Sequence, residues 1–99
     1  MSDGLAFIAE WYERHCDGNW AHEFGVSVDT IDNPGWSVNI DLVGTELDNL
    51  VVDWIKDGAE HDEVWLSWRS TGVKFEAACG AGDLDRALNA FRHFAEGGL

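Results

Sequence analysis

Residues 24–42 restrict the possible folds most, because their apolar side chains recur at every second position. This two-residue period is typical of a strand with one buried face and one face in water. The turn Asp32-Asn33-Pro34-Gly35 interrupts the pattern, with proline presetting φ and glycine accepting a positive φ. The alternating residues are Phe24, Val26, Val28 and Thr30 before the turn, and Trp36, Val38, Ile40 and Leu42 after it. The segment therefore predicts an antiparallel hairpin.

The rest of the chain predicts two helices and three more strands. Apolar residues at helical spacing indicate one helix over residues 3–16, capped by Asp3 and ended by Gly18, and another over residues 84–95, capped by Asp83. Alternating runs indicate strands over residues 50–56, where Val52 and Trp54 share a face, 63–69 and 73–79. This order predicts one α+β domain over residues 1–99, an antiparallel β-meander of about five strands with an N-terminal and a C-terminal helix packed on one face.

The charge of the chain narrows the classes of partner. Its formal net charge is −13 and its sequence pI is near 4.3. Direct binding to nucleic acid or to an anionic membrane needs a basic footprint, which this composition argues against. The acidity leaves two interpretations open, a solubility adaptation or a basic partner protein. We see no apolar signal segment and no membrane span in the sequence, so we expect a cytoplasmic protein, either a monomer or a homodimer.

Two cysteines raise the question of thiol chemistry. His15 and Cys16 are adjacent on the predicted first helix, where neighbouring side chains point about 100° apart, so His15 is poorly placed to activate the thiol. Cys79 precedes a glycine loop and a helix start, a position that can lower a thiol pKa. Asp83 and Asp85 would repel a thiolate or an anion there. We favour structural roles for both cysteines and expect no disulfide between them.

Metal-ligand residue types occur without the spacing of a known site. His61-Asp62-Glu63 and His22-Glu23 offer such types, but neither has the helical i, i+4 pairing or the paired spacing of a zinc site. The sequence therefore predicts no metal and no cofactor.

The six tryptophans exceed what a core of this size can enclose, so we expect one or two to be partly exposed. Trp11 has the helical spacing of a core residue. Trp20 and Trp36 are neighboured by the carboxylates of the first hairpin, Asp29, Asp32 and Asp41. Aromatic anchors ringed by charge of one sign suit a docking surface for a basic protein.

The residues named above resemble the immunity protein 53 family of bacterial polymorphic toxin systems. The resemblance is most specific in the first forty residues and weaker afterwards, through Asp53-Trp54, Phe75-Glu76, Leu84, Leu88 and Phe91. The specific matches are Trp11-Tyr12, Cys16-Asp17-Gly18, Trp20, His22, Gly25-Val26, Thr30 to Trp36, Ile40-Asp41-Leu42 and Thr45. Ala21 departs from the family pattern, which has an acidic residue after the loop tryptophan. Ala77 and Cys79 stand where that pattern has glycines, which weakens the case for a catalytic Cys79.

The resemblance implies a small protein that binds and neutralises a toxin encoded beside it, with no chemistry of its own. The charge adds a separate inference: a nuclease toxin has a basic substrate groove that an acidic inhibitor could occupy. We expect the contact surface to comprise Trp20, His22, Asp29, Asp32, Trp36, Asn39 and Asp41. Trp36 has a rival interpretation, in which it closes the hairpin onto the first helix.

Two other functions remain open from the sequence. One is a small cysteine-dependent enzyme, sulfurtransferase-like, that uses Cys79 or Cys16 and would show enhanced thiol reactivity. The other is an acidic mimic of nucleic acid, which would bind many basic proteins instead of one toxin.

Overall fold

The computed structural model describes residues 3–16, 18–32, 34–58 and 64–97. Two long helices frame the chain, and a short helix that the sequence did not predict follows the first of them. The elements in chain order are α1 (Asp3–Arg14), α2 (Trp20–Glu23), β1 (Val26–Ile31), β2 (Gly35–Asp41), β3 (Val51–Asp57), β4 (Leu66–Thr71), β5 (Lys74–Gly80) and α3 (Leu84–Ala95).

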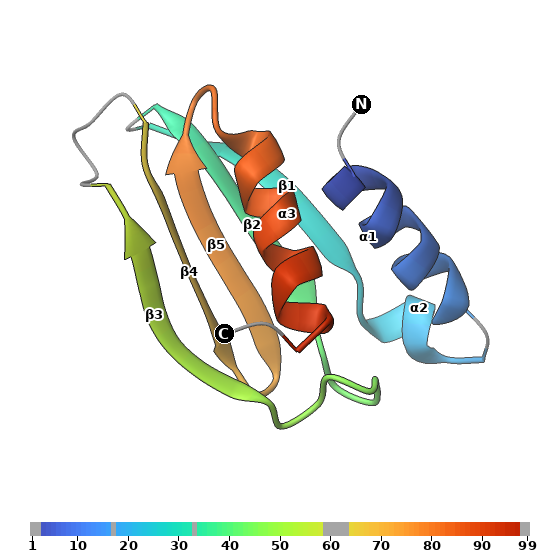
Figure 1. Ribbon diagram of the computed structural model, residues 1–99. Helices are drawn as coiled ribbons and strands as arrows, with labels where there is room; N and C mark the ends of the chain where they lie inside the picture. Colours follow the sequence, from blue (N-terminus) through green and yellow to red (C-terminus); the bar gives the residue numbers. More distant parts are fainter. Residues whose placement is uncertain (1–2, 17, 33, 59–63, 98–99) are drawn as a thin grey trace.

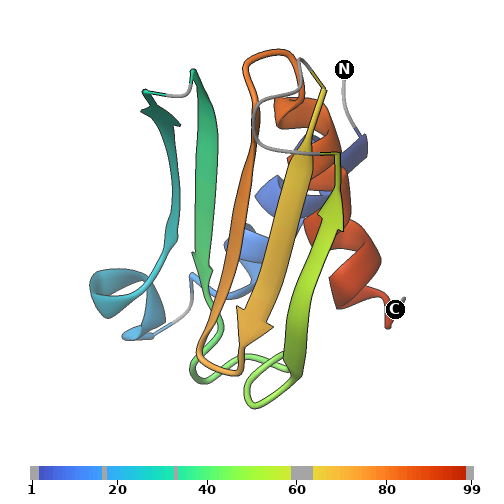
Figure 2. The same ribbon diagram turned by 90° about the vertical axis from the view of Figure 1, so that its left-hand side faces the viewer.

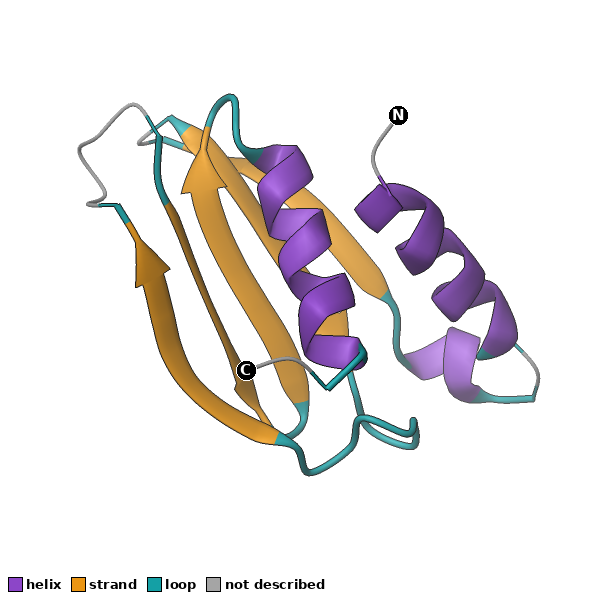
Figure 3. Cartoon of the chain, viewed as in Figure 1, coloured by secondary structure: helices purple, strands orange, loops and turns teal. Residues whose placement is uncertain are grey.

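All the strand pairs are antiparallel and form one five-stranded sheet (Figure 1). The helices α1 and α3 lie on the same side of this sheet, behind it in Figure 2, and the secondary-structure view separates the two layers (Figure 3). The predicted α+β class, with five antiparallel strands and a helix at each end, is confirmed.

The strand order differs from that of a simple meander. A meander would place β3 beside β2, but the observed order is β1-β2-β5-β4-β3. The connection over residues 42–50 runs along one end of the sheet to its far edge, and the chain then returns through β4 to β5 (Figure 2). The β1–β2 hairpin and the β3–β4–β5 meander therefore meet along β2 and β5, which leaves β1 and β3 as the two edges.

Strand alternation divides the sheet into a helix-facing side and an open side. Val38 and Ile40 of β2 are fully buried against the helices and pair with Ala77 and Phe75 of β5. Gly35 begins β2 where a Cβ would collide with the carbonyl oxygen of Cys79, so only glycine allows the two strands to approach there. The inward positions predicted for Val38, Ile40, Phe75, Ala77 and Cys79 are confirmed, whereas Val73, which was expected on the same face, lies before β5 and is 53% exposed.

Aromatic rings join the helices to the sheet. Phe75 lies 5.1 Å from Phe91 of α3, ring centroid to centroid, and Trp68 lies 5.6 Å from Phe75. The Trp11 ring of α1 is 5.2 Å from Phe91 in an edge-to-face arrangement and is only 1% exposed. Edge-to-face pairs add to the stabilisation from buried area. The prediction that Trp11 is a core residue is confirmed.

The first helix packs chiefly against α3. A Cβ on Gly4 would lie 2.5 Å from the backbone carbon of Leu88 and 2.6 Å from the backbone nitrogen of Asn89. The two helices therefore cross closely at Gly4, and Phe7 extends the contact by packing edge-on against Phe91. This close crossing draws α1 toward α3 and away from the outer strand β1.

Three local expectations differ from the structure. Phe24 follows the short helix α2, and the strand begins at Val26. A bulge between Val52 and Ile55 adds a residue to β3, so these two both face the helices while Trp54 lies on the open side, over Arg69. Asp83 occupies the N-cap position of α3 but its carboxylate accepts the backbone N–H of Trp65 at 2.9 Å instead of capping the helix.

Replacing Gly4 by alanine tests the close helix crossing. Alanine in a helix interior normally stabilises by up to about 1 kcal/mol relative to glycine. Here the added methyl must push α1 away from α3, so G4A is expected to lower the free energy of unfolding by about 1–3 kcal/mol. Denaturant unfolding measures this. The matched control is G82A, where a Cβ would meet nothing within 4 Å. Equal effects of the two substitutions would contradict the crossing.

Candidate partner-binding site

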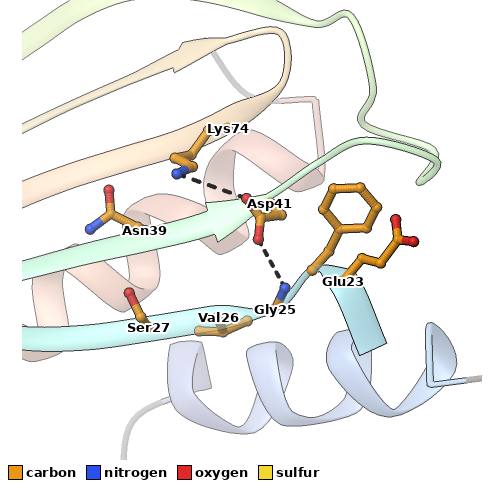
Figure 4. A pocket seen from close by; sticks show the side chains of 8 residues that line it. Glu23, Gly25, Val26, Ser27, Asn39, Asp41 and Lys74 are labelled. Atoms are coloured by element: carbon orange, nitrogen blue, oxygen red, sulfur yellow. Dashed lines mark hydrogen bonds and ion pairs between the residues drawn. The ribbon is translucent and has the colours of Figure 1, made fainter. Parts of the chain in front are cut away.

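A polar hollow of about 250 Å³ opens beside the start of β1 (Figure 4). We call it the hairpin hollow. Its walls come from the end of α2, the two strands of the hairpin and the start of β5. The lining residues are Glu23, Phe24, Gly25, Val26, Ser27, Asn39, Asp41 and Lys74. Two of the predicted contact residues, Asn39 and Asp41, therefore lie in one concave site.

The side chain of Asp41 connects the neighbouring segments at this end of the hairpin. Its Oδ2 accepts the backbone N–H of Gly25 at 2.9 Å, and its Oδ1 lies 3.9 Å from the ammonium group of Lys74 (Figure 4). The backbone N–H of Asp41 donates to the carbonyl oxygen of Gly25 at 3.0 Å. Asp41 of β2 thus contacts both the residue before β1 and the first residue of β5, at the hollow.

The open side of the sheet is charge-balanced in one half and acidic in the other. In the balanced half the guanidinium of Arg69 donates to Glu76 at 2.8 Å and covers the Trp54 ring at 4.8 Å. Toward β1 the open side carries Asp29, which is exposed and pairs in register with Ser37. No described cation forms an ion pair with Asp29. Asp29 therefore presents an uncompensated negative charge on the hairpin half, where Asp41 is paired with Lys74.

Trp20 is half-buried in a cluster of aromatic rings. Its ring centroid lies 5.7 Å from Trp11, 6.0 Å from Tyr12 and 6.1 Å from Phe24, and its indole N–H donates to the carbonyl oxygen of Val43 at 2.9 Å. These contacts position α2 against the α1 end and the loop after β2. His22 lies on the same short helix and is exposed.

Trp36 lies on the helix-facing side of β2, opposite to Asn39 and Asp41. It is half-buried against the core, and its indole N–H donates to the carbonyl oxygen of Ala81 at 2.9 Å, in the loop before α3. Asp32 is exposed in the hairpin turn, at the other end of β2 from Asp41. The structure thus brings Asp29, Asn39 and Asp41 onto one surface, and it places Trp36 on the other face of the sheet.

Three lining residues with polar side chains were absent from the predicted contact surface: Glu23, Ser27 and Lys74. Ser27 pairs with Asn39, and Lys74 pairs with Asp41, in the strand register. The first pairing follows from the hairpin turn and could have been derived from the sequence. The second requires β5 to lie beside β2, which no local pattern indicates.

The two thiols form no disulfide and lie in different environments, one exposed and one buried. Cys79 is fully buried, and burial, helped by the negative charge of Asp83, raises the pKa of its thiol to about 11. The backbone N–H of Trp36 and the charge of Arg86 oppose this shift more weakly. Cys16 is exposed, is free of a disulfide and directs its sulfur to the carbonyl oxygen of Tyr12 at 3.3 Å.

No metal or membrane feature emerges from the part of the chain that the structure describes. There, no three His, Cys, Asp or Glu side chains gather as a set of metal ligands, and no helix is both long and apolar enough to cross a bilayer. The candidate His61-Asp62-Glu63 lies outside the described residues, as do Asp17 and Asn33.

Comparison with known proteins supplies one match. A family model described as immunity protein 53 matches residues 5–96 of the chain. No curated protein and no solved structure matches it. The match covers all the helices and strands except the first two residues of α1. The resemblance inferred from the aromatic and turn residues is thereby confirmed.

Thiol labelling tests the different environments of the two cysteines. Iodoacetamide at pH 8 is expected to label Cys16 in the folded protein and Cys79 only after denaturation, because the buried thiol stays protonated. C16S should leave the folded protein unlabelled. Rapid labelling of Cys79 in the folded protein would instead support the enzyme hypothesis.

The raised pKa of Cys79 also predicts how stability depends on pH. Because this pKa is raised from 9.0 to about 11, the thiol of the unfolded chain loses its proton at a lower pH than the thiol of the folded protein. The free energy of unfolding should therefore fall as the pH rises from 9 to 11.

Proposed function

The chain belongs to the immunity protein 53 family, and on that premise we propose that it binds and neutralises one cognate toxin by direct contact through the acidic side formed by α1, α2 and β1. The family is one of immunity proteins, so a toxin is the expected partner. The protein acts in this proposal as an inhibitor in the cytoplasm of the producing cell, without chemistry of its own.

The observation that carries the proposal is that most carboxylates of residues 3–32 lack a cationic partner among the described residues. Residues 3–32 contain seven carboxylates, Asp3, Glu10, Glu13, Asp17, Glu23, Asp29 and Asp32, and a single Lys or Arg, Arg14. Arg14 is itself 3.8 Å from Glu46, and Asp3 is 3.6 Å from Arg92. The other described carboxylates of this segment form no ion pair with a described residue. They create a negative field that steers a basic partner toward this side.

The proposed contact surface is centred on the hairpin hollow. Asp29 and Asn39 present their side chains to the open side, and Asp41, which is paired with Lys74, positions the lining of the hollow. Glu23 also lines the hollow and forms no ion pair with a described residue, so it suits the ammonium or guanidinium group of a toxin side chain. His22 and Asp32 extend the surface at its two ends. Trp20 and Trp36 both donate their indole N–H groups within the protein, so we assign them the role of positioning α2 and the hairpin.

The immunity hypothesis is favoured over the two alternatives for separate reasons. A cysteine-dependent enzyme needs an accessible thiolate, whereas the thiol of Cys79 is buried and its pKa is raised. The exposed thiol of Cys16 donates to the carbonyl oxygen of Tyr12 and has no hydrogen bond to a basic side chain among the described residues. A general nucleic-acid mimic would spread charge over its whole surface, whereas the Arg69–Glu76 pair neutralises the part of the open side far from β1. An uneven surface discriminates better between basic partners.

Co-expression with the neighbouring toxin tests the function. The experiment expresses the active toxin with this chain, and separately with non-cognate basic toxins, and measures growth and complex formation by pull-down. We expect rescue of growth and a stable complex with the cognate toxin alone. An active toxin that the chain neither binds nor counteracts would refute the proposal, and equal binding to all the basic toxins would support the mimic.

Charge reversal on the two edges of the sheet tests the location of the surface. D29K should lower the association rate constant for the toxin by roughly three- to tenfold at low ionic strength, because it weakens the steering field at the contact surface. The matched control D53K makes the same change in net charge on the exposed strand β3. Stopped-flow measurements at low and high salt separate the two variants. If D53K slows association as much as D29K, the contact surface lies elsewhere.

A further inference from the structure

We propose that the groove between α1 and the edge strand β1 anchors an apolar segment of the toxin that is flanked by Lys or Arg. This inference rests on the proposed function and names a second site along the same edge strand, on its helix-facing side. The groove has a volume of about 420 Å³ and is separate from the polar lining of the hairpin hollow except at Gly25 and Val26. Its lining is Leu5, Ile8, Ala9, Tyr12, Gly25 and Val26.

The groove follows from the packing of α1. Leu5, Ile8, Ala9 and Tyr12 occupy positions i, i+3, i+4 and i+7, so they form one apolar stripe along the helix. This stripe would cover β1 if α1 lay flat on the sheet. The close crossing at Gly4 instead draws α1 onto α3, and the stripe is left beside β1 with Leu5 49% exposed and Tyr12 37% exposed.

The helix-facing side of β1 is correspondingly uncovered. The sequence predicts that Val26, Val28 and Thr30 face inward, but Val28 is 41% exposed and Thr30 is exposed as well. Val38, which pairs directly with Val28 on β2, is fully buried. The core therefore ends between β2 and β1. An apolar side chain from a partner would complete the layer that α1 leaves unfinished.

The charges around the groove favour a basic partner over a second copy of this chain. Glu13 is exposed on α1, Glu23 ends α2, and Asp32 follows β1. None of these three forms an ion pair with a described residue. A two-fold interface through the groove would bring the same carboxylates together, and like charges at an interface oppose association. A Lys- or Arg-flanked segment would neutralise them.

The other apolar edge of the sheet has a different character. Val51 of β3 is 71% exposed, and with Leu50, Val52, Phe94 and Gly97 it lines a hollow of about 240 Å³. This edge carries Lys56, and Arg86 pairs with Asp57 beside it. Among the described residues the charges at this edge are thus largely balanced and do not select a basic segment. Of these two hollows, the groove beside β1 is the one that combines exposed apolar surface with unneutralised negative charge from described residues.

Two lysine substitutions on α1 provide the first test. A9K places a long cationic side chain in the groove, whereas A6K makes the same change on the same helix at an exposed position outside it. Lysine is a good helix former, so both variants should fold. We expect A9K to raise the dissociation constant for the catalytically inactive toxin roughly tenfold or more, and A6K to change it less than about threefold.

A second pair of variants removes apolar surface without adding charge. V28S should weaken toxin binding roughly three- to tenfold, whereas V51S at the opposite edge should leave it unchanged. Thermal unfolding of each variant checks its fold. Equal affinities for A9K and A6K, with wild-type binding intact, would overturn the groove while leaving the proposed function standing. A wild-type protein that does not bind the toxin would overturn both.

Light scattering tests whether a second copy of this chain occupies the groove instead of the toxin. The wild-type protein alone should be monomeric at micromolar concentrations, and A9K should not change its mass. A wild-type dimer that A9K converts to a monomer would show that a second copy covers the groove, and this would overturn the proposal.

Discussion

The pairing of β2 with β5 is the contact on which the other features of this structure depend. It joins the hairpin to the β3–β4–β5 meander and makes β2 an interior strand, so Val38 and Ile40 are fully enclosed. It requires a glycine at position 35, where β2 passes the backbone of Cys79. It also sends residues 42–50 to the far edge of the sheet and leaves β1 as an edge strand, which exposes the surface that we assign to the toxin.

The second constraint is that two helices must share one face of a small sheet. The aromatic contacts of Phe91 centre α3 over β5, and Gly4 allows α1 to press against α3. Because α1 packs against α3, it lies too far from β1 to cover that strand. The same geometry therefore stabilises the core on one side and leaves an apolar groove on the other. A binding partner can bury the apolar surface of this groove, which the free protein is too small to enclose.

The electrostatics follow the same division of the molecule. Four of the six Lys and Arg residues lie on β4, β5 or α3, where Arg69, Lys74, Arg86 and Arg92 each have a carboxylate within 4 Å. The α1–α2–β1 side keeps its negative charge, with Arg14 held by Glu46. Repulsion on this side costs stability in the free protein, and the binding of a basic partner would relieve it. This cost is consistent with a protein whose working state is a complex.

The local sequence determined the two long helices, the five strands and the family, whereas the tertiary structure decided the short helix α2 and which surfaces are free. Alternation over residues 24–42 and the turn after Asp32 required a hairpin, because a two-residue period allows no other burial. The same alternation already separates Trp36 from Asn39, since they are three residues apart, so this part of the site could have been resolved from the sequence. The burial of Trp20, the pairing of Lys74 with Asp41 and the exposure of Val28 could not. Each depends on long-range packing between segments whose order in the sheet no local pattern encodes.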